Sequence, residues 1–251
     1  MAKPNGMILY QGPSLLDGSP IVVIAGGLNA GSKNAKTGNM IQTYILRSDM
    51  EPTKAVFTGA DSAICGNCPH RGTALGDSNT GRTCYVNVGQ GPLQVYRAFK
   101  RGIYPVADAS LAGLVLGRNV RLGTYGDPAA VPNHVWESLL VGSSGHTGYT
   151  HQWKIAPQLR ALVMASADSE NDAREAHAAG WRTFRVALPC DAPKIDNEVS
   201  CPASAEAGRK LTCDKCLACS GANGRRGSIV IQAHGGFAVM ANIKKRSELH
   251  I

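Results

Sequence analysis

The chain has 251 residues, 43% of them hydrophobic, which is enough for a full core in one large domain and excludes wholesale disorder. Lysine and arginine number 26 against 18 acidic residues, so the formal net charge of +8 favours polyanionic partners, first of all nucleic acid or a nucleotide. The longest apolar run near the start, residues 21–25, is strand-sized, and no secretory pattern follows Met1. We expect a cytoplasmic protein with no membrane partner.

The first part of the chain predicts a β-hairpin. Residues 21–27 and 40–47 are strand-like, and the connecting residues 29–39 are polar, basic and contain glycine. These connecting residues lack the spacing of a Walker phosphate loop. They therefore predict a hairpin tip, with contact to an anionic partner as the sharper hypothesis.

Beyond residue 90, short strands alternate with helices, which is typical of parallel βαβ units. The expected class is therefore α/β, either a (β/α) partial barrel or an open parallel sheet, with an N-terminal hairpin and a C-terminal cysteine-rich metal-binding segment. We divide the chain into a hairpin region packed on the core (1–60), a (β/α) core with the first cysteine site (61–190), and a cysteine-rich segment with a closing strand (191–251), all in one compact domain. The patterns predict helices over 92–101, 133–140 and 170–179, and strands over 120–125, 148–151, 161–166, 182–188 and 228–233.

Polar side chains follow several of these predicted strands. In (β/α) barrels the working residues lie at the C-terminal ends of strands, so these positions are candidates for a catalytic rim. Each also has an ordinary explanation, as a turn residue, a helix cap or a hydrogen-bonded polar side chain. The candidates are Asp127, His151, Asp168 and His234.

The cysteines are spaced in two sets that indicate metal ligands rather than disulfides. The second set is Cys213, Cys216 and Cys219, with two residues between each cysteine and the next, and Cys201 lies upstream. Three cysteines at this spacing strain a single tetrahedral zinc but suit the spread iron corners of a [4Fe–4S] cluster. The set can therefore hold a cluster, or zinc with one thiol to spare.

The first set has only three cysteines, Cys65, Cys68 and Cys84. Three thiolates leave one metal position open, as a catalytic metal requires, or leave a zinc position that His70 could fill. The eighth cysteine, Cys190, is interpreted as a small core residue.

Two short basic clusters, Arg225–Arg226 and Lys244–Arg246, stand apart from the otherwise spread positive charge. They are either solvated surface or contacts to DNA or RNA.

Several segments resemble an uncharacterised family of cysteine-rich bacteriophage proteins, which would place the chain in a host cytoplasm. That family brings no established activity. The segments are 64–72, 84–87, 123–128, 148–151, 180–185 and the closing cysteine set.

A more distant resemblance is to radical S-adenosylmethionine enzymes, which are partial (β/α) barrels with a three-cysteine [4Fe–4S] cluster and often a second cluster. It implies that Cys65, Cys68 and Cys84 hold the open cluster, with Tyr85 beside the last ligand. The run Gly126-Asp127-Pro128 is similar to that family's Gly-Glu-Pro motif, which contacts the methionine amino group. The cysteine spacing differs: two and then fifteen intervening residues stand where the family has three and then two.

Two hypotheses follow. The first is an iron–sulfur metalloprotein with a radical-enzyme-like core that modifies a nucleotide, nucleic acid or peptide and binds S-adenosylmethionine. The alternative is a zinc-stabilised phage protein that binds nucleic acid and has no catalytic activity.

Overall fold

The computed structural model describes residues 4–31, 34–188, 195–204, 207–208, 211–222 and 227–248. It is a mixed α/β structure built on one large, mostly parallel sheet, so the α/β class predicted from the sequence is confirmed. Cys190, Arg225 and Arg226 lie outside the described residues, and their predicted roles are not addressed. No helix in the described ranges is long and apolar enough to cross a bilayer.

The sheet has nine strands in the order β1-β2-β3-β6-β7-β8-β9-β11-β10. The first three form an antiparallel meander, and from β3 onward each neighbouring pair is parallel. The carboxyl ends of these parallel strands therefore meet at one edge. The strands are β1 (Gly6–Pro13), β2 (Pro20–Gly26), β3 (Ile41–Arg47), β6 (Asn119–Tyr125), β7 (Gly145–Thr150), β8 (Met164–Ala167), β9 (Thr183–Ala187), β10 (Glu198–Ser200) and β11 (Ser228–Gln232).

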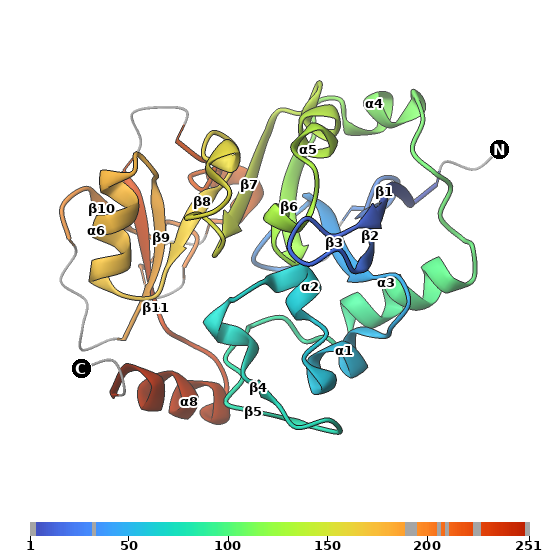
Figure 1. Cartoon of the computed structure of the whole chain (residues 1–251). Helices are drawn as coiled ribbons and strands as arrows, with labels where there is room; N and C mark the ends of the chain where they lie inside the picture. The colour runs from blue at the N-terminus through green and yellow to red at the C-terminus, as the bar shows by residue number, and fades with distance from the viewer. Residues whose placement is uncertain are drawn as a thin grey trace.

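Helices flank the sheet, and a small ribbon of β4 (Thr73–Ala74) and β5 (Asn79–Thr80) stands beside it. Figure 1 shows the hairpin strands at one end of the molecule, β9 to β11 at the other, and α8 below, near β4 and β5. The helices are α1 (Pro52–Thr58), α2 (Ser62–Cys65), α3 (Gly91–Lys100), α4 (Ser110–Val115), α5 (Asn133–Leu140), α6 (Glu170–Ala178), α7 (Cys213–Cys216) and α8 (Phe237–Glu248), with short 3-10 turns at Pro69–Arg71, Pro128–Ala130 and Pro157–Leu159.

The core explains why these segments form strands. Residues 21–25 of β2 are fully buried, and Trp136 of α5 and Leu122 of β6 pack in the same cluster. A smaller apolar cluster joins Met164 and Ile229 to two thiols, those of Cys201 and Cys219. Part of the second cysteine set is thus built into the apolar interior.

Local signals set the limits of α6. The Ser169 hydroxyl accepts a hydrogen bond from the Asp172 N–H at 3.0 Å, which caps the helix start. Gly180, with φ of 80°, follows the last turn, as the sequence predicted. The strand predicted over 161–166 begins only at Met164, because Pro157 opens a 3-10 turn whose bonds run on to Val163.

A buried ion pair holds the far edge of the sheet. Arg185 on β9 donates two hydrogen bonds, of 2.9 and 2.7 Å, to the Glu198 carboxylate on β10, and β11 lies between these strands. The two side chains are 3% and 0% exposed. Removing one partner would leave an uncompensated buried charge.

We predict that Glu198→Gln lowers the free energy of unfolding by about 3 kcal/mol, because the buried Arg185 guanidinium then loses the negative charge of its carboxylate partner. Chemical denaturation measures this loss. The matched control is Glu170→Gln, which removes the exposed Arg174–Glu170 pair and should have a much smaller effect. Equal losses in the two variants would contradict the prediction.

Candidate functional site

One cavity of about 370 Å³ is lined by all seven described cysteines. It also contains residues from the carboxyl ends of β6, β7 and β8, including Asp127, His151 and Asp168. The cavity also extends toward the amino ends of the strands, where Arg121 of β6 and Thr147 of β7 line it. The two cysteine sets, distant in sequence, therefore face a common space.

The first cysteine set is held by a loop that is fixed by an arginine. Cys65 ends α2, and the Cys68 N–H donates to the Cys65 carbonyl at 3.3 Å in the following turn. Cys84 returns to this turn because its N–H donates to the His70 carbonyl at 3.0 Å. The Arg71 guanidinium donates to the carbonyls of residues 59 and 66 and to the Asp61 carboxylate. Burial raises the pKa of the Cys65 and Cys84 thiols, and their neighbouring thiols add to the rise for both.

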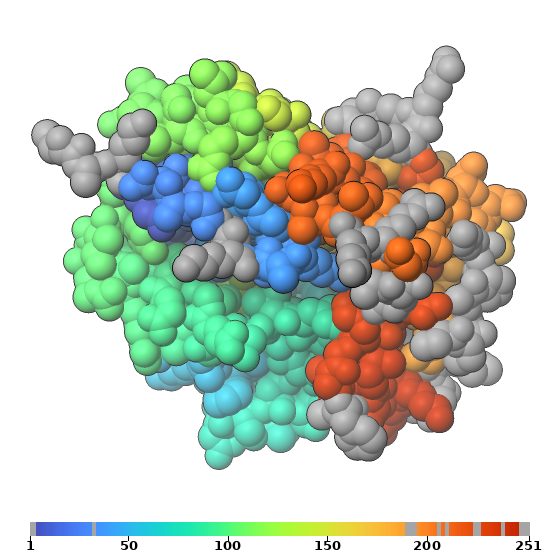
Figure 2. All heavy atoms as spheres, turned by 180° about the vertical axis from the view of Figure 1, so that it is seen from behind, coloured from blue at the N-terminus to red at the C-terminus, as the bar shows by residue number. Residues whose placement is uncertain are grey.

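The second set is docked against the N-terminal hairpin. The N–H of Cys213 donates to the Lys36 carbonyl at 2.9 Å, and the Asp214 N–H donates to the Thr37 carbonyl at 3.2 Å. In Figure 2 the orange segment carrying this set lies beside the blue hairpin loop. The partner of this loop within the chain is thus the cysteine segment. Burial raises the pKa of Cys219 to about 12, with Cys201 and Cys213 contributing.

The spacing of the thiols differs from that of a single-ion site. Bonds of about 2.3 Å to a tetrahedral zinc place thiolates about 3.8 Å apart. Among the described residues, no three cysteine sulfurs lie within 4.8 Å of one another. The described cysteines are therefore not already arranged as three ligands of one zinc ion.

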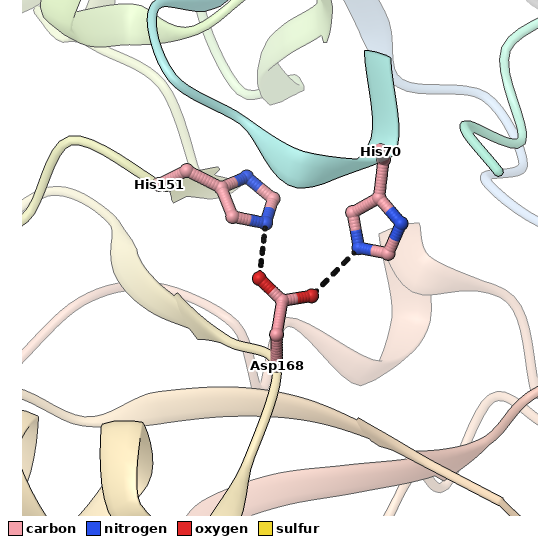
Figure 3. Close-up of side chains that lie close together, drawn as sticks. All are labelled: His70, His151 and Asp168. Atoms are coloured by element: carbon pink, nitrogen blue, oxygen red, sulfur yellow. Dashed lines mark ion pairs between the residues drawn. The ribbon is translucent and has the colours of Figure 1, made fainter. Parts of the chain in front are cut away.

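Three of the predicted site residues do meet at one point, as Figure 3 shows for His70, His151 and Asp168. Asp168 accepts from His70 Nε2 at 2.9 Å through one oxygen and lies 3.4 Å from His151 Nε2 through the other. The other ring nitrogen of His70 is 2.7 Å from the Thr83 hydroxyl, which fixes the orientation of the ring. His70, His151 and Asp168 are the group of described residues with metal-ligand spacing.

Charge stabilises this cluster. Burial alone would lower the pKa of His151, but hydrogen bonds to Asp168 and Cys68 raise it well above its ordinary value. Burial would raise the pKa of Asp168, yet the two histidines hold it well below its ordinary value. The Cys68 sulfur is 3.9 Å from the same Nε2 that faces Asp168. A protease-type cysteine triad uses both ring nitrogens, so this arrangement does not match one.

Asp127 fixes the position of His151 through hydrogen bonds. One of its oxygens accepts from the Thr150 hydroxyl at 2.7 Å and the Ala129 N–H at 2.9 Å, and the other accepts from the His151 N–H at 2.8 Å. Burial raises its pKa. Asp127 therefore positions His151 through its backbone N–H, and its catalytic and cofactor-binding roles stay predictions. Gly126 beside it lines the same cavity.

His234 lies apart from this cluster. The His234 ring stacks on the Tyr85 ring with centroids 5.0 Å apart, and the backbone N–H of His234 donates to the Tyr85 hydroxyl at 3.2 Å. The ring Nε2 of His234 is 3.4 Å from Lys36 Nζ. Tyr85 is 47% exposed, so this group lines the mouth of the cavity. His234 thus lines the cavity, where it contacts Tyr85 and Lys36.

Sequence reasoning missed Arg121 and Tyr149, which also line the cavity. Arg121 stands between Val120 and Leu122 on β6. A charged residue flanked by two buried apolar ones in a parallel strand is unusual, and that was the available signal.

The chain matches no protein-family model, no curated protein and no solved structure. The geometry of the cavity therefore carries the functional assignment.

The His70–Asp168–His151 cluster predicts a defined pH dependence in the metal-free protein. The pKa of Asp168 lies below its ordinary value of 3.8, so its contribution to stability is present above that pH and lost as the pH falls. The pKa of His151 lies well above 6.5, so its contribution is complete below 6.5 and lost as the pH rises through the higher value.

We therefore expect Asp168→Asn to lose most stability between about pH 4 and pH 6.5, and less on either side. Denaturation curves across this range measure the difference from the unchanged protein. Asp77→Asn, at an exposed position, is the control and should show no such window. A loss in Asp168→Asn that does not vary with pH would count against the charged cluster.

Proposed function

We propose that the chain is an iron–sulfur protein with a partial (β/α) barrel core similar to that of radical S-adenosylmethionine enzymes. Cys65, Cys68 and Cys84 would hold an open [4Fe–4S] cluster, and Cys201, Cys213, Cys216 and Cys219 a second one. The substrate would be a nucleotide, nucleic acid or peptide. When bound, the three-cysteine cluster supplies one electron and an open iron position for S-adenosylmethionine.

Strand order supports the barrel-like core. The parallel strands β3, β6, β7, β8 and β9 are neighbours in the order in which they occur along the chain, and only the last two depart from it, since β11 lies beside β9 and the short β10 lies outside it. This is the order of a (β/α) barrel, whose site lies at the carboxyl ends of its strands. The three-thiol set stands in the connection from β3 to β6, and Gly126 and Asp127 directly follow β6.

The lining of the cavity supports curvature of the sheet. Residues of five neighbouring strands, β6, β7, β8, β9 and β11, line the same cavity of about 370 Å³. A sheet that curls around the cavity accounts for this lining, as in a partial barrel.

The single observation that carries the proposal is the cavity that the two cysteine sets share. The first set faces His151 at the carboxyl end of β7, and the second set contacts Asn119 at the amino end of β6. The chemistry of the donors agrees with it, since thiolates are the usual ligands of iron–sulfur clusters and seven cysteines line the cavity. His151 beside Cys68 could donate an N–H to a cluster-bound thiolate, which stabilises its negative charge.

Metal analysis of protein purified without oxygen tests the proposal. We predict iron and sulfide with broad visible absorbance, and about half the iron in each of Cys68→Ser and Cys216→Ser, because each removes one cluster ligand. Cys190→Ser is the matched control, since Cys190 belongs to neither set, and it should keep all the iron. Colourless protein that contains zinc would overturn the proposal.

A second candidate follows from the spacing of His70, His151 and Asp168. Two imidazoles and a carboxylate within 4.8 Å of one another could hold a mononuclear ion such as zinc. The chain would then be a zinc-stabilised nucleic-acid-binding protein without catalysis. Lys244 and Lys245, exposed on α8, are candidates for its phosphate contacts.

His70→Ala separates the two candidates. If His70 is a zinc ligand, this variant loses metal as completely as Asp168→Ala does. If the three thiols hold an open cluster, we predict that His70→Ala keeps its iron and that S-adenosylmethionine changes the magnetic resonance spectrum of the reduced cluster. Metal loss in His70→Ala, together with no spectral response in the unchanged protein, would leave the zinc candidate.

A further inference from the structure

Arg121 occupies an unusual place in the cavity. It lies on β6, and its guanidinium carbon is 5.2 Å from the centre of the Tyr149 ring, a cation–π distance. Its positive charge favours the thiolate forms of Cys213 and Cys219 in the second cysteine set. The Tyr149 ring in turn packs on the Phe184 ring, with centroids 4.5 Å apart, so the ring beneath the guanidinium is itself fixed by packing.

The cavity separates its charges. Its two carboxylates, Asp127 and Asp168, both contact His151, which lies beside Cys68 of the first cysteine set. Its two cations from lysine or arginine, Lys36 and Arg121, lie toward the second set. Within the described ranges, neither cation forms an ion pair with a carboxylate.

We propose that Arg121, assisted by Lys36, is an anion subsite that binds the phosphate or carboxylate group of the substrate between the two cysteine sets. The guanidinium is a planar fork that suits bidentate contacts to either group, and Tyr149 fixes its plane. Lys36 is exposed at the mouth, where a compact ammonium attracts an incoming anion. Calling the ligand a substrate rests on the proposed function, but anion binding at Arg121 does not require a cluster.

A competing role for Arg121 is to neutralise the thiolates of the second set. Arginine lowers the energy of any nearby anion, so Cys213 and Cys219 benefit from its charge whether or not a ligand binds. This role needs only a positive charge, which lysine also supplies. Bidentate binding of an anionic ligand also needs the planar guanidinium of arginine, so a lysine at position 121 separates the two roles.

The experiment measures binding of adenosine monophosphate and of a short peptide with a free carboxylate to the full-length protein, by calorimetry without oxygen. We expect one probe to bind and its affinity to fall about tenfold or more in Arg121→Gln, and clearly in Arg121→Lys, which keeps the charge but not the fork. Arg97→Gln, which removes a half-exposed arginine outside the cavity, is the control for net charge and should bind normally. Metal content is measured for every variant.

The outcomes separate the possibilities. Weaker binding in Arg121→Lys with unchanged metal content supports the subsite, and the probe that binds identifies phosphate or carboxylate as the anion. Metal loss in Arg121→Gln but not in Arg121→Lys, alongside unaltered probe affinity, assigns the residue to thiolate neutralisation and overturns the proposal. Failure of the unchanged protein to bind either probe overturns it too. Because binding is measured directly, a protein without iron that still binds through Arg121 would refute the proposed function and retain the subsite.

Discussion

The Asp127 carboxylate is the constraint on which the site depends. The backbone N–H of Asp127 donates to the Ile64 carbonyl at 2.6 Å, which ties the end of β6 to the helix that carries Cys65. Its oxygens accept from Thr150 and from the His151 N–H, which ties the same point to the end of β7. Burial of a carboxylate is costly and raises its pKa, but each oxygen is hydrogen-bonded. Gly126 makes this approach feasible, since a Cβ there would lie 2.7 Å from the Cβ of Ile45.

Both cysteine loops are ordered by the same device. The guanidinium of Arg71 binds carbonyls and a carboxylate in the first loop, and that of Arg182 binds the carbonyls of residues 218, 221 and 227 in the second. Irregular backbone leaves carbonyls without partners, and a fork of five donors satisfies several at once. The loops are therefore positioned by protein contacts before any metal binds. The thiols with raised pKa are neutral in that state, so metal binding would release protons as it completes the site.

Sequence patterns predicted the parts that depend on near neighbours. The C-x2-C spacing and the polar residues after β6, β7 and β8 are local signals, and the structure brings Asp127, His151 and Asp168 together because parallel strands share an edge. The strand β1, the helix α8 and the role of Arg121 were missed, because each depends on long-range pairing or packing. The separation of His234 from the other strand-end residues has the same cause. It follows β11, whose end lies beside Tyr85 and Lys36 rather than beside β8.

The contacts of His234 also bear on how a ligand reaches the cavity. Lys36 of the hairpin loop, Tyr85, and His234 after β11 meet at the mouth of the cavity through side-chain contacts. Such weak, partly exposed contacts separate at far lower cost than the backbone hydrogen bonds between strands. On the proposed anion subsite, a ligand that enters here would bring its anionic group first past Lys36 and then to Arg121.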